Sequence, residues 1–320
     1  MEKVDLVYMW VNGNDPEWLK QKQEMLVRSG KELAEQALVK GRFMDNGELR
    51  YSLRSVEMYA PWVNKIYIVT ADQTPEWLNT DHPKIQMVSH RDIAAAEYLP
   101  TFNSTAIEMF LPNIEGLSER FLLANDDTFF ARPTTPDFFY TDKGLPIARY
   151  TRHMPRHESP YLSMLYNAQE LVYEKCGKLY RLNPHHNIDA YLKSDVLKCN
   201  EAFAEQVERT RGQRFRTPED FHRSAWLYWA LANGRAKKKK VRHYGTVSSF
   251  GELVKCILNG RYDVDSRSFG LHGVGVEKSI AKYNPTLMCL NDGEWTTDNC
   301  RSGMKNYLER RFPQKSSFEK

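Results

Sequence analysis

The sequence lacks the features that would place a chain in a membrane or hold it together with disulfides. No segment approaches the roughly 20 consecutive apolar residues of a membrane span, and the first residues carry neither the basic region nor the apolar stretch of a signal peptide. The five cysteines are odd in number, scattered and without a C-x-x-C pair, which argues against both a disulfide framework and a zinc cluster. We therefore expect a soluble, cytoplasmic protein.

A strong excess of one charge is also missing. The 45 basic and 41 acidic residues leave a net charge of +4, and this near balance argues against a dedicated nucleic-acid-binding protein. What the sequence does have is 320 residues, 41% of them hydrophobic, which suffices for a large buried core. The length suits one large domain, or one domain with a substantial insertion.

Two stretches show the pattern of a strand, a turn and the start of a helix. The first, LVYMWVNGNDPEW, begins at Leu6 with an apolar run and then turns polar, with Asp15 in position to cap a helix that begins at Pro16. The second, KIYIVTADQTPEWL, begins at Lys65 and predicts a helix from Pro75. Such repeated units predict an α/β fold with a parallel sheet.

Further elements extend this alternation. KIQMVSH and RFLLAN predict two more strands, and an amphipathic helix is expected over residues 49–58, with Arg50 and Arg54 four positions apart on one face. A short helix in FNSTAIEMF carries Glu108. Residues 1–131 therefore predict a nucleotide-binding type of sheet.

The rest of the chain divides into two parts. Residues 132–184 are rich in aromatic, proline and basic residues, and we interpret them as an insertion or lid beside the sheet. Residues 185–320 are expected to be largely helical, with one helix from His185 and another from Pro218, before a strand that ends at Asn291 and a closing helix. All three parts are expected to form one domain.

The strongest chemical signal is the triplet Asn125-Asp126-Asp127 directly after an apolar strand. Mg²⁺ and Mn²⁺ prefer carboxylate oxygens, and in nucleotide enzymes one or two carboxylates, diphosphate oxygens and water complete their coordination. The triplet therefore predicts a metal site. A polar hairpin turn is the alternative that the triplet alone leaves open.

Single residues elsewhere could carry chemistry, and each has a structural alternative. Glu108 is either a functional acid or an ordinary solvated helix residue. His185 and His186 could move a proton near neutral pH, or could serve a turn or helix cap. Arg216 could bind phosphate oxygens with its two-pronged guanidinium, or form an exposed ion pair with Glu219 or Asp220.

Polar residues also follow the first and last predicted strands. Asn12, Gly13 and Asp15 follow the first, and Asn291 and Asp292 follow the last. Ligands of open α/β sheets bind beyond the carboxyl ends of the strands. We therefore expect these residues along one edge of the sheet, with the turn after the first strand facing the ligand.

Four consecutive lysines, Lys237 to Lys240, form the densest run of charge. Such a run is commonly a solvated surface. It could also bind anionic lipid headgroups or a charged polymer, which would give a peripheral membrane association.

Four separated blocks of the sequence resemble the Stealth proteins, a family of sugar-phosphate transferases that includes bacterial capsule-polymer enzymes and the catalytic part of GlcNAc-1-phosphotransferase. The blocks occur in the order of the family across nearly the whole chain. They are DLVYMWVNGNDPEW, the long stretch from RFMDNGELRYSLRS through RFLLANDDTFF, the stretch from HHNID to TRGQRFRTPED, and LMCLNDGEWTTDN.

The resemblance implies a fold similar to the GT-A nucleotide-sugar fold. It also implies transfer of a sugar 1-phosphate, expected to be an N-acetylhexosamine 1-phosphate, from a UDP-sugar such as UDP-GlcNAc to a hydroxyl of an acceptor glycan or growing capsule polymer. The products would be a phosphodiester and UMP. A divalent cation, Mg²⁺ or Mn²⁺, would neutralise charge at the diphosphate.

The functional residues of the family fall on particular positions of this sequence. Its essential acidic residue in AIE corresponds to Glu108, and the aspartate of NDD corresponds to Asp127, with Asp126 beside it. Its essential histidine precedes an arginine by thirty positions, which selects His186 and Arg216. Asp126 and Asp127 would then hold the metal ion. Arg216 would steady the transferred phosphoryl group, and either His186 or Glu108 would take the proton of the acceptor hydroxyl.

The same blocks contain Arg50, Arg54, Asn125 and His185, which we also expect at the substrate. The third block departs from the animal members, because HNI stands here where they have H-x-P. The segment 132–184, with His153 and His157, matches none of the blocks.

Two other functions are compatible with parts of this pattern. A metal-dependent GT-A glycosyltransferase would use the same sheet and acidic strand end but would release UDP. A non-catalytic polysaccharide-binding module could use the aromatic residues, 12% of the chain, to stack on sugars. The donor sugar and the acceptor depend on the shape of the pocket, which the sequence does not specify.

Overall fold

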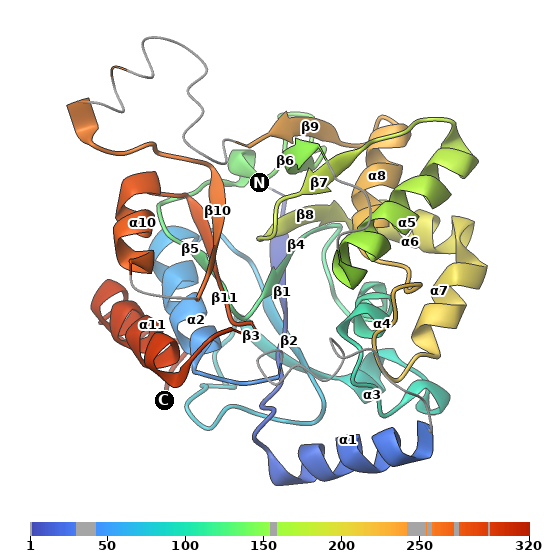
Figure 1. Ribbon diagram of the computed structural model, residues 1–320, viewed down its shortest axis with the longest axis horizontal. Coiled ribbons are helices and arrows are strands. Elements are labelled where there is room, and N and C mark those ends of the chain that lie inside the picture. Colours follow the sequence, from blue (N-terminus) through green and yellow to red (C-terminus); the bar gives the residue numbers. More distant parts are fainter. Residues whose placement is uncertain are drawn as a thin grey trace.

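A five-stranded sheet forms the framework of the N-terminal half (Figure 1). The computed structural model describes residues 2–29, 43–153, 159–241, 254, 258–271, 275–293 and 295–320. The order of the strands in this sheet is β3-β2-β1-β4-β8. Their bounds are Val4–Met9 (β1), Ile66–Thr70 (β2), Ile85–Ser89 (β3), Arg120–Asn125 (β4) and Asp189–Leu192 (β8). β1 to β4 run parallel to one another, and β8 runs antiparallel to β4.

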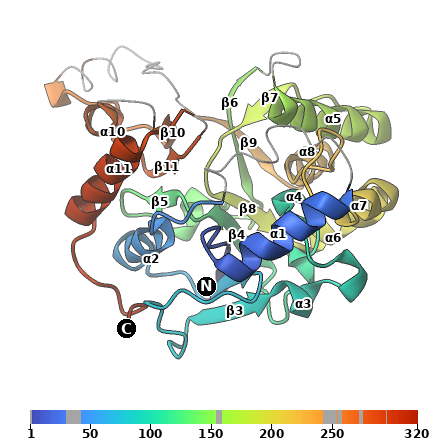
Figure 2. The ribbon, with the colours of Figure 1, turned by 60° about the horizontal axis from the view of Figure 1, so that its bottom comes forward.

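The order of the strands reverses at β1. The chain places β2 and β3 on one side of β1 and then crosses to place β4 on the other. The loops that leave the carboxyl ends of β1 and β4 therefore diverge and leave room between them, as at the switch point of other α/β sheets. Beyond the end of β1, the helix α1 (Pro16–Ser29) lies across this edge of the sheet (Figures 1 and 2). The α/β class predicted from the sequence is confirmed.

Alternate residues of the strands pack against different layers. Leu6 and Tyr8 of β1 belong to a buried cluster with Leu49, Leu53 and Val56 of α2 (Glu48–Tyr59). The apolar spacing of α2 gives this helix one buried face, as the sequence predicts. The predicted strands at 65 and 84 and the short helix before Glu108, α4 (Ser104–Glu108), are likewise present.

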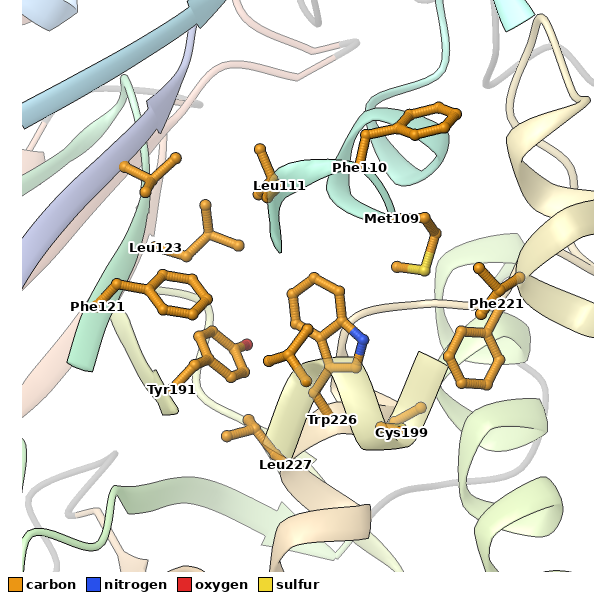
Figure 3. Packing of buried hydrophobic residues seen from close by; sticks show 14 of the residues in the cluster. Met109, Phe110, Leu111, Phe121, Leu123, Tyr191, Cys199, Phe221, Trp226 and Leu227 are labelled. Atoms are coloured by element: carbon orange, nitrogen blue, oxygen red, sulfur yellow. The ribbon is translucent and has the colours of Figure 1, made fainter. Parts of the chain in front are cut away.

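The other face of the sheet is covered by helices that come later in the chain. Trp226 of α8 (Ser224–Ala232) lies among apolar side chains of β4, β8 and the segment after α4 (Figure 3). Its ring meets that of Tyr191 edge-on at 5.3 Å, and its indole N–H donates to Asn200 Oδ1 at 2.8 Å. The first and second halves of the chain therefore share one core.

A second sheet contains three strands. Its order is β10-β11-β5, with bounds Ser266–Gly270, Leu287–Asn291 and Thr128–Phe130. β10 runs parallel and β5 antiparallel to β11. The helices α10 (Val276–Tyr283) and α11 (Asp298–Arg311) pack beside it (Figure 2). The predicted last strand and closing helix are thus confirmed.

The middle segment, expected as an insertion or lid, contains regular elements. A third sheet has the order β7-β6-β9, with bounds Leu182–Pro184, Ile147–His153 and Lys237–Lys240. The lysine run is β9, and all four of its residues are exposed. The long helix of this segment, α5 (Pro160–Cys176), packs against α8.

The remaining helices of the described residues are short. They are α3 (His90–Ile93), α6 (Lys193–Ala202) and α7 (Ala204–Arg211), with the 3₁₀ turns η3 (Ala96–Tyr98), η4 (Leu111–Asn113) and η5 (Pro136–Phe138). Among the described residues, none of the helices combines the length and the apolar character needed to cross a bilayer. His157 and Cys256 lie outside the described residues.

Three predicted helix starts are wrong. No helix begins at Pro75, because this segment pairs with the C-terminus: Lys320 N–H donates to Trp77 O at 2.9 Å, and Leu78 forms a bridge with Glu319. The chain after His185 first forms the edge strand β8 and becomes helical only at Lys193. A partner distant in the sequence decides both cases.

The third wrong start is Pro218. Asp220 accepts hydrogen bonds from the backbone N–H of Thr217, at 3.1 Å, and from its hydroxyl, at 2.8 Å, so it closes a local turn. The helix α8 then begins at Ser224. The residues between, which the prediction placed in a helix, are free to line the site.

Candidate functional site

A cavity of about 650 Å³ lies at the carboxyl edge of the main sheet. Its walls come from the ends of β1, β2 and β4, from the loop after β11, from α4, and from the turn that precedes α8. Its polar lining includes Glu108, Asp126, Asp127, His186 and Arg216, which come from four separate parts of the sequence. The structure therefore brings together the five residues for which the resemblance implies metal-binding or catalytic roles.

The acidic wall is the turn after β4. Asp127 is tied to the last strand of the second sheet, because Leu290 N–H donates to its carbonyl oxygen at 2.9 Å. Asp126 Oδ1 accepts from Asp127 N–H at 3.1 Å. β5 follows this turn but pairs with β11, not with β4. The turn is therefore not the polar hairpin that was the alternative, and its carboxylates face the cavity.

Crowding and burial change the acidity of this wall. Burial raises the pKa of Asp127 to about 6, although the thiol of Cys289, which donates to Asp127 Oδ2 at 3.4 Å, opposes the shift. Burial and the charges of Asp127 and Glu48 raise the pKa of Asp126 well above its ordinary value. Burial also raises the pKa of Glu48, at the start of α2, to about 7. Burial and the neighbouring carboxylates thus outweigh the positive charge of Arg223 at Asp127.

The lining around Asp127 has ligand atoms that could hold a divalent cation. Asp127 Oδ1 is buried and has no hydrogen-bond partner in the described structure, and it belongs to a group of carboxylates that disfavour one another's charge. One ligand atom each from Asp127, His186 and Cys289 lie within 4.8 Å of one another. Carboxylates suit Mg²⁺ and Mn²⁺, whereas imidazole and thiolate suit softer metals.

The lining of the cavity also carries positive charge. Arg216 donates to the hydroxyl of Ser104 at the start of α4. Arg223 Nη1 lies 3.3 Å from Glu108 Oε1, and both side chains are buried. Burial raises the pKa of Glu108, although Arg223 and Arg216 oppose the shift. Glu108 is therefore not the solvated helix residue that was its alternative.

The two adjacent histidines have different environments. His185 is buried with both ring nitrogens engaged, at 2.7 Å from Ser266 Oγ and 3.0 Å from Asp189 Oδ1. His186 lines the cavity and meets the ring of Tyr161 edge-on at 6.1 Å. Burial and the positive charge of Arg223 lower the pKa of His186 to about 4. Its imidazole is consequently neutral at pH 7, and the lowered pKa makes it a weaker base than an ordinary histidine.

The predicted residues of the turn after β1 make structural contacts and are not in the described lining of the cavity. Asp15 Oδ1 accepts from Trp18 N–H at 2.8 Å and so caps α1. Gly13 donates to Phe43 O at 2.7 Å, and a Cβ at this glycine would lie 1.9 Å from that oxygen. Asn12 N–H donates to Gln73 Oε1 at 2.9 Å. The described lining takes Met9, Trp10 and Val11 from this strand, and not the three predicted residues.

The other predicted substrate residues divide between the cavity and the C-terminus. Asn125, Asn291 and Asp292 line the cavity. Arg54 instead donates to Glu319 Oε1 at 2.7 Å, and Arg50 lies 3.6 Å from the same carboxylate. The structure therefore does not bring Arg50, Arg54 or His185 into the described lining, because each has a structural partner elsewhere.

Several lining residues were missed by the sequence reasoning. They are Glu48, Tyr161, His222 and Arg223. Cys289, which lies beside Asp127, was missed as well. His222 and Arg223 had a visible signal, since polar residues that directly precede an apolar helix and follow Arg216 are natural candidates for the same site. Tyr161 had none, because only the fold of α5 against α8 brings it to the cavity.

Comparison with known proteins agrees with the predicted resemblance. Conserved region 1 of the Stealth proteins matches residues 2–26, and conserved region 2 matches residues 42–148. The chain belongs to the Stealth family. The two matched regions include β1 with its turn, Glu108 and the Asn125 to Asp127 triplet.

Curated relatives of this Stealth protein are similar over nearly its whole length. An exopolysaccharide phosphotransferase of Streptomyces coelicolor is 35% identical over 99% of this chain and 51% of its own. The capsular polysaccharide phosphotransferase WcwK of Streptococcus pneumoniae is 29% identical over 100% of this chain and 99% of its own. The chain spans about half the length of the first of these relatives. A crystal structure of the galactosyltransferase LgtC with donor and acceptor sugar analogs covers 98% of this chain and 96% of its own, at 11% identity and a TM-score of 0.44.

Proposed function

We propose that this Stealth protein transfers a sugar 1-phosphate from a UDP-sugar to a hydroxyl of an acceptor glycan. The observation that carries the proposal is that carboxylates and guanidiniums line one cavity. Asp126 and Asp127 supply the carboxylates, and Arg216 and Arg223 supply the guanidiniums. A nucleoside diphosphate with a bound cation has the complementary distribution of charge, since the cation meets the carboxylates and the phosphate oxygens meet the guanidiniums.

The place of the cavity in the sheet also favours a nucleotide. The space lies where the loops after β1 and β4 diverge, which is where open α/β sheets bind nucleotides. The names of the curated relatives, exopolysaccharide phosphotransferase and capsular polysaccharide phosphotransferase, supply the reaction class. An N-acetylhexosamine 1-phosphate from UDP-GlcNAc or a related donor is the proposed transferred group, and a capsule or cell-surface polymer is the proposed acceptor.

The chain's own residues would divide the work of a phosphoryl transfer. The acceptor oxygen attacks the phosphorus that bears the sugar, the bond from that phosphorus to the bridging oxygen of the diphosphate breaks, and UMP leaves. His186, neutral and at the cavity surface, takes the proton of the attacking hydroxyl. Arg216 binds the oxygens of the transferred phosphoryl group, where negative charge spreads in the transition state.

Asp126 and Asp127 would hold Mg²⁺ or Mn²⁺, which would neutralise negative charge on the diphosphate. Asn125, Asn291 and Asp292 are placed to contact the donor or its bound cation from the adjacent strand ends. Asp292 is already oriented by Arg301, whose Nε lies 2.8 Å from its Oδ2. The three residues therefore add polar groups to the cavity that the charged residues line.

The test is a screen of UDP-sugars with an oligosaccharide acceptor, read out by the nucleotide released. We expect UMP and a phosphodiester-linked product, and we expect Asp127→Ala and His186→Ala to abolish the reaction. Asp298→Ala is the matched control, because Asp298 is exposed at the start of α11 and away from the cavity lining. Release of UDP with a glycosidic product would refute phosphoryl transfer in favour of glycosyl transfer. Metal-independent glycan binding without turnover would refute an enzyme altogether.

A further inference from the structure

The ion pair between Glu108 and Arg223 lies within the cavity. We propose that Arg223 is a second arginine that binds the transferred phosphoryl group, and that Glu108 is a positioning residue that holds Arg223 in place and accepts no proton. This inference rests on the proposed function and assigns a role within the same site. It also decides between the two proton acceptors that the sequence leaves open, because it excludes Glu108.

Burial makes this pair unusual. Glu108 is 4% exposed and Arg223 is 7% exposed, and the two charged groups are 3.3 Å apart. A buried charge is stable only with a partner, so removing either side chain leaves the other uncompensated. Glu108 Oε1 therefore faces the guanidinium, and Oε2 is buried without a hydrogen-bond partner in the described structure. The adjacent positive charge of Arg223 opposes protonation of this carboxylate.

The arginine has capacity left for a ligand. Arg223 has five N–H donors, and its contact with Glu108 is through Nη1 at 3.3 Å, without the geometry of a hydrogen bond in the described structure. The Nε of Arg216 is also buried and has no partner there, and Arg216 forms no ion pair with any described carboxylate. Two guanidiniums with unused donors in one cavity match the oxygens of a phosphoryl group, which accept hydrogen bonds from several directions.

Arg223 lines the same cavity as Asp127, the proposed metal ligand, and His186, the proposed proton acceptor. A phosphoryl group bound beside the metal ion and the attacking hydroxyl would therefore share this space with the guanidinium. Arg223 holds this place because the turn closed by Asp220 ends just before it and α8 begins just after it.

The experiment compares Arg223→Gln, Arg223→Lys and Glu108→Gln with the full-length chain, by the kinetics of UMP release and by calorimetric binding of UDP with Mg²⁺. We expect Arg223→Gln to lower kcat/KM for the donor by about 10²- to 10³-fold, as loss of a donor to transition-state charge does. Arg223→Lys should recover part of this loss. Glu108→Gln should also lower kcat/KM. The double variant, with both Glu108→Gln and Arg223→Gln, should have a kcat/KM no lower than that of Arg223→Gln alone.

The pH profile separates positioning from proton transfer. If Glu108 only positions Arg223, the fall in kcat/KM at low pH should be the same in Glu108→Gln as in the unmodified chain. If Glu108 is the base, this acid limb of the profile should disappear in Glu108→Gln. Arg235→Gln is the control for loss of an arginine–carboxylate pair, since Arg235 lies 3.1 Å from Asp195 and is half-exposed outside the cavity lining. Thermal unfolding of each variant identifies any that fails to fold.

The outcomes distinguish this inference from the proposed function. Wild-type kinetics in Arg223→Gln, or loss of the acid limb in Glu108→Gln, would overturn the inference and leave the function intact. Absence of UMP release by the unmodified chain would overturn the function instead. In that case the binding measurement still decides the inference, because UDP with Mg²⁺ should bind Arg223→Gln more weakly than the unmodified chain, and equal affinity would overturn it.

Discussion

Replacing Asp127 by asparagine should stabilise the metal-free protein while it destroys the site. Burial raises the pKa of this carboxyl from 3.8 to about 6, so the folded state favours its protonated form. A group with a raised folded pKa contributes stability below the unfolded pKa, and this contribution is lost as the pH rises through the folded pKa. Above pH 6 the ionised carboxylate therefore destabilises the fold. An asparagine side chain at this position is never ionised and escapes this loss.

The size of the effect follows from the shift. A pKa change of about 2 units corresponds to about 3 kcal/mol, which is the expected gain in free energy of unfolding for Asp127→Asn at pH 8. The gain should shrink to roughly half of that at pH 5, where the folded carboxyl is mostly protonated. Asparagine has nearly the same shape as aspartate, so the substitution leaves no cavity and adds no destabilisation from lost packing.

The assay is denaturant unfolding at pH 5 and pH 8, in EDTA and in excess Mg²⁺. In Mg²⁺ the unmodified protein should gain stability, because the cation binds only the folded state, and Asp127→Asn should gain much less. Asp298→Asn is the control, since this carboxylate is 97% exposed. A variant equally destabilised at both pH values, or one that responds to Mg²⁺ like the unmodified protein, would refute the reasoning.

Three further predictions concern the core, the cavity and the lysine strand. Trp226→Ala should lower the free energy of unfolding by about 3–5 kcal/mol, measured by denaturant unfolding, because it empties the centre of the core. Trp295 lines the cavity and is 78% exposed, and we expect it to stack on an acceptor sugar. Trp295→Ala should therefore raise KM for the acceptor and leave donor binding unchanged, and Trp295→Phe should preserve the acceptor KM. Replacing Lys237 to Lys240 by alanine should weaken flotation with anionic liposomes, and unchanged flotation would contradict a membrane role for this exposed strand.

Local sequence signals predicted the elements whose stability is local. The apolar strand at Leu6, the cap at Asp15 and the helix over 49–58 are all set by neighbours within a few residues. The wrong helix at Pro75 has the same local signals. It fails because the C-terminal residues from Phe318 onward bond to its backbone, and this partner lies more than 200 positions away.

The residues of the candidate site also divide into those with a local signal in the sequence and those whose role depends on a distant partner. The acidic triplet at Asn125 was visible in the sequence because a strand end followed by carboxylates is a local pattern. Arg50 and Arg54 had an equally suggestive local pattern, but Glu319 takes both of them. Which charged residue is free for a ligand depends on which one has a distant structural partner, and a single sequence does not contain that information in local form.

The cavity combines features that are unfavourable in the free protein. Like charges crowd one wall, where burial and repulsion raise the pKa of Asp126 and Glu48. The same cavity holds the guanidinium of Arg216 and the buried guanidinium of Arg223, with Glu108 as the ion-pair partner of Arg223. Either set of charges alone would be an unexplained cost to stability. Because both sets line one cavity, a cation and a diphosphate bound together would relieve both costs, and the unfavourable charges of the free protein are therefore an argument for a ligand of mixed charge.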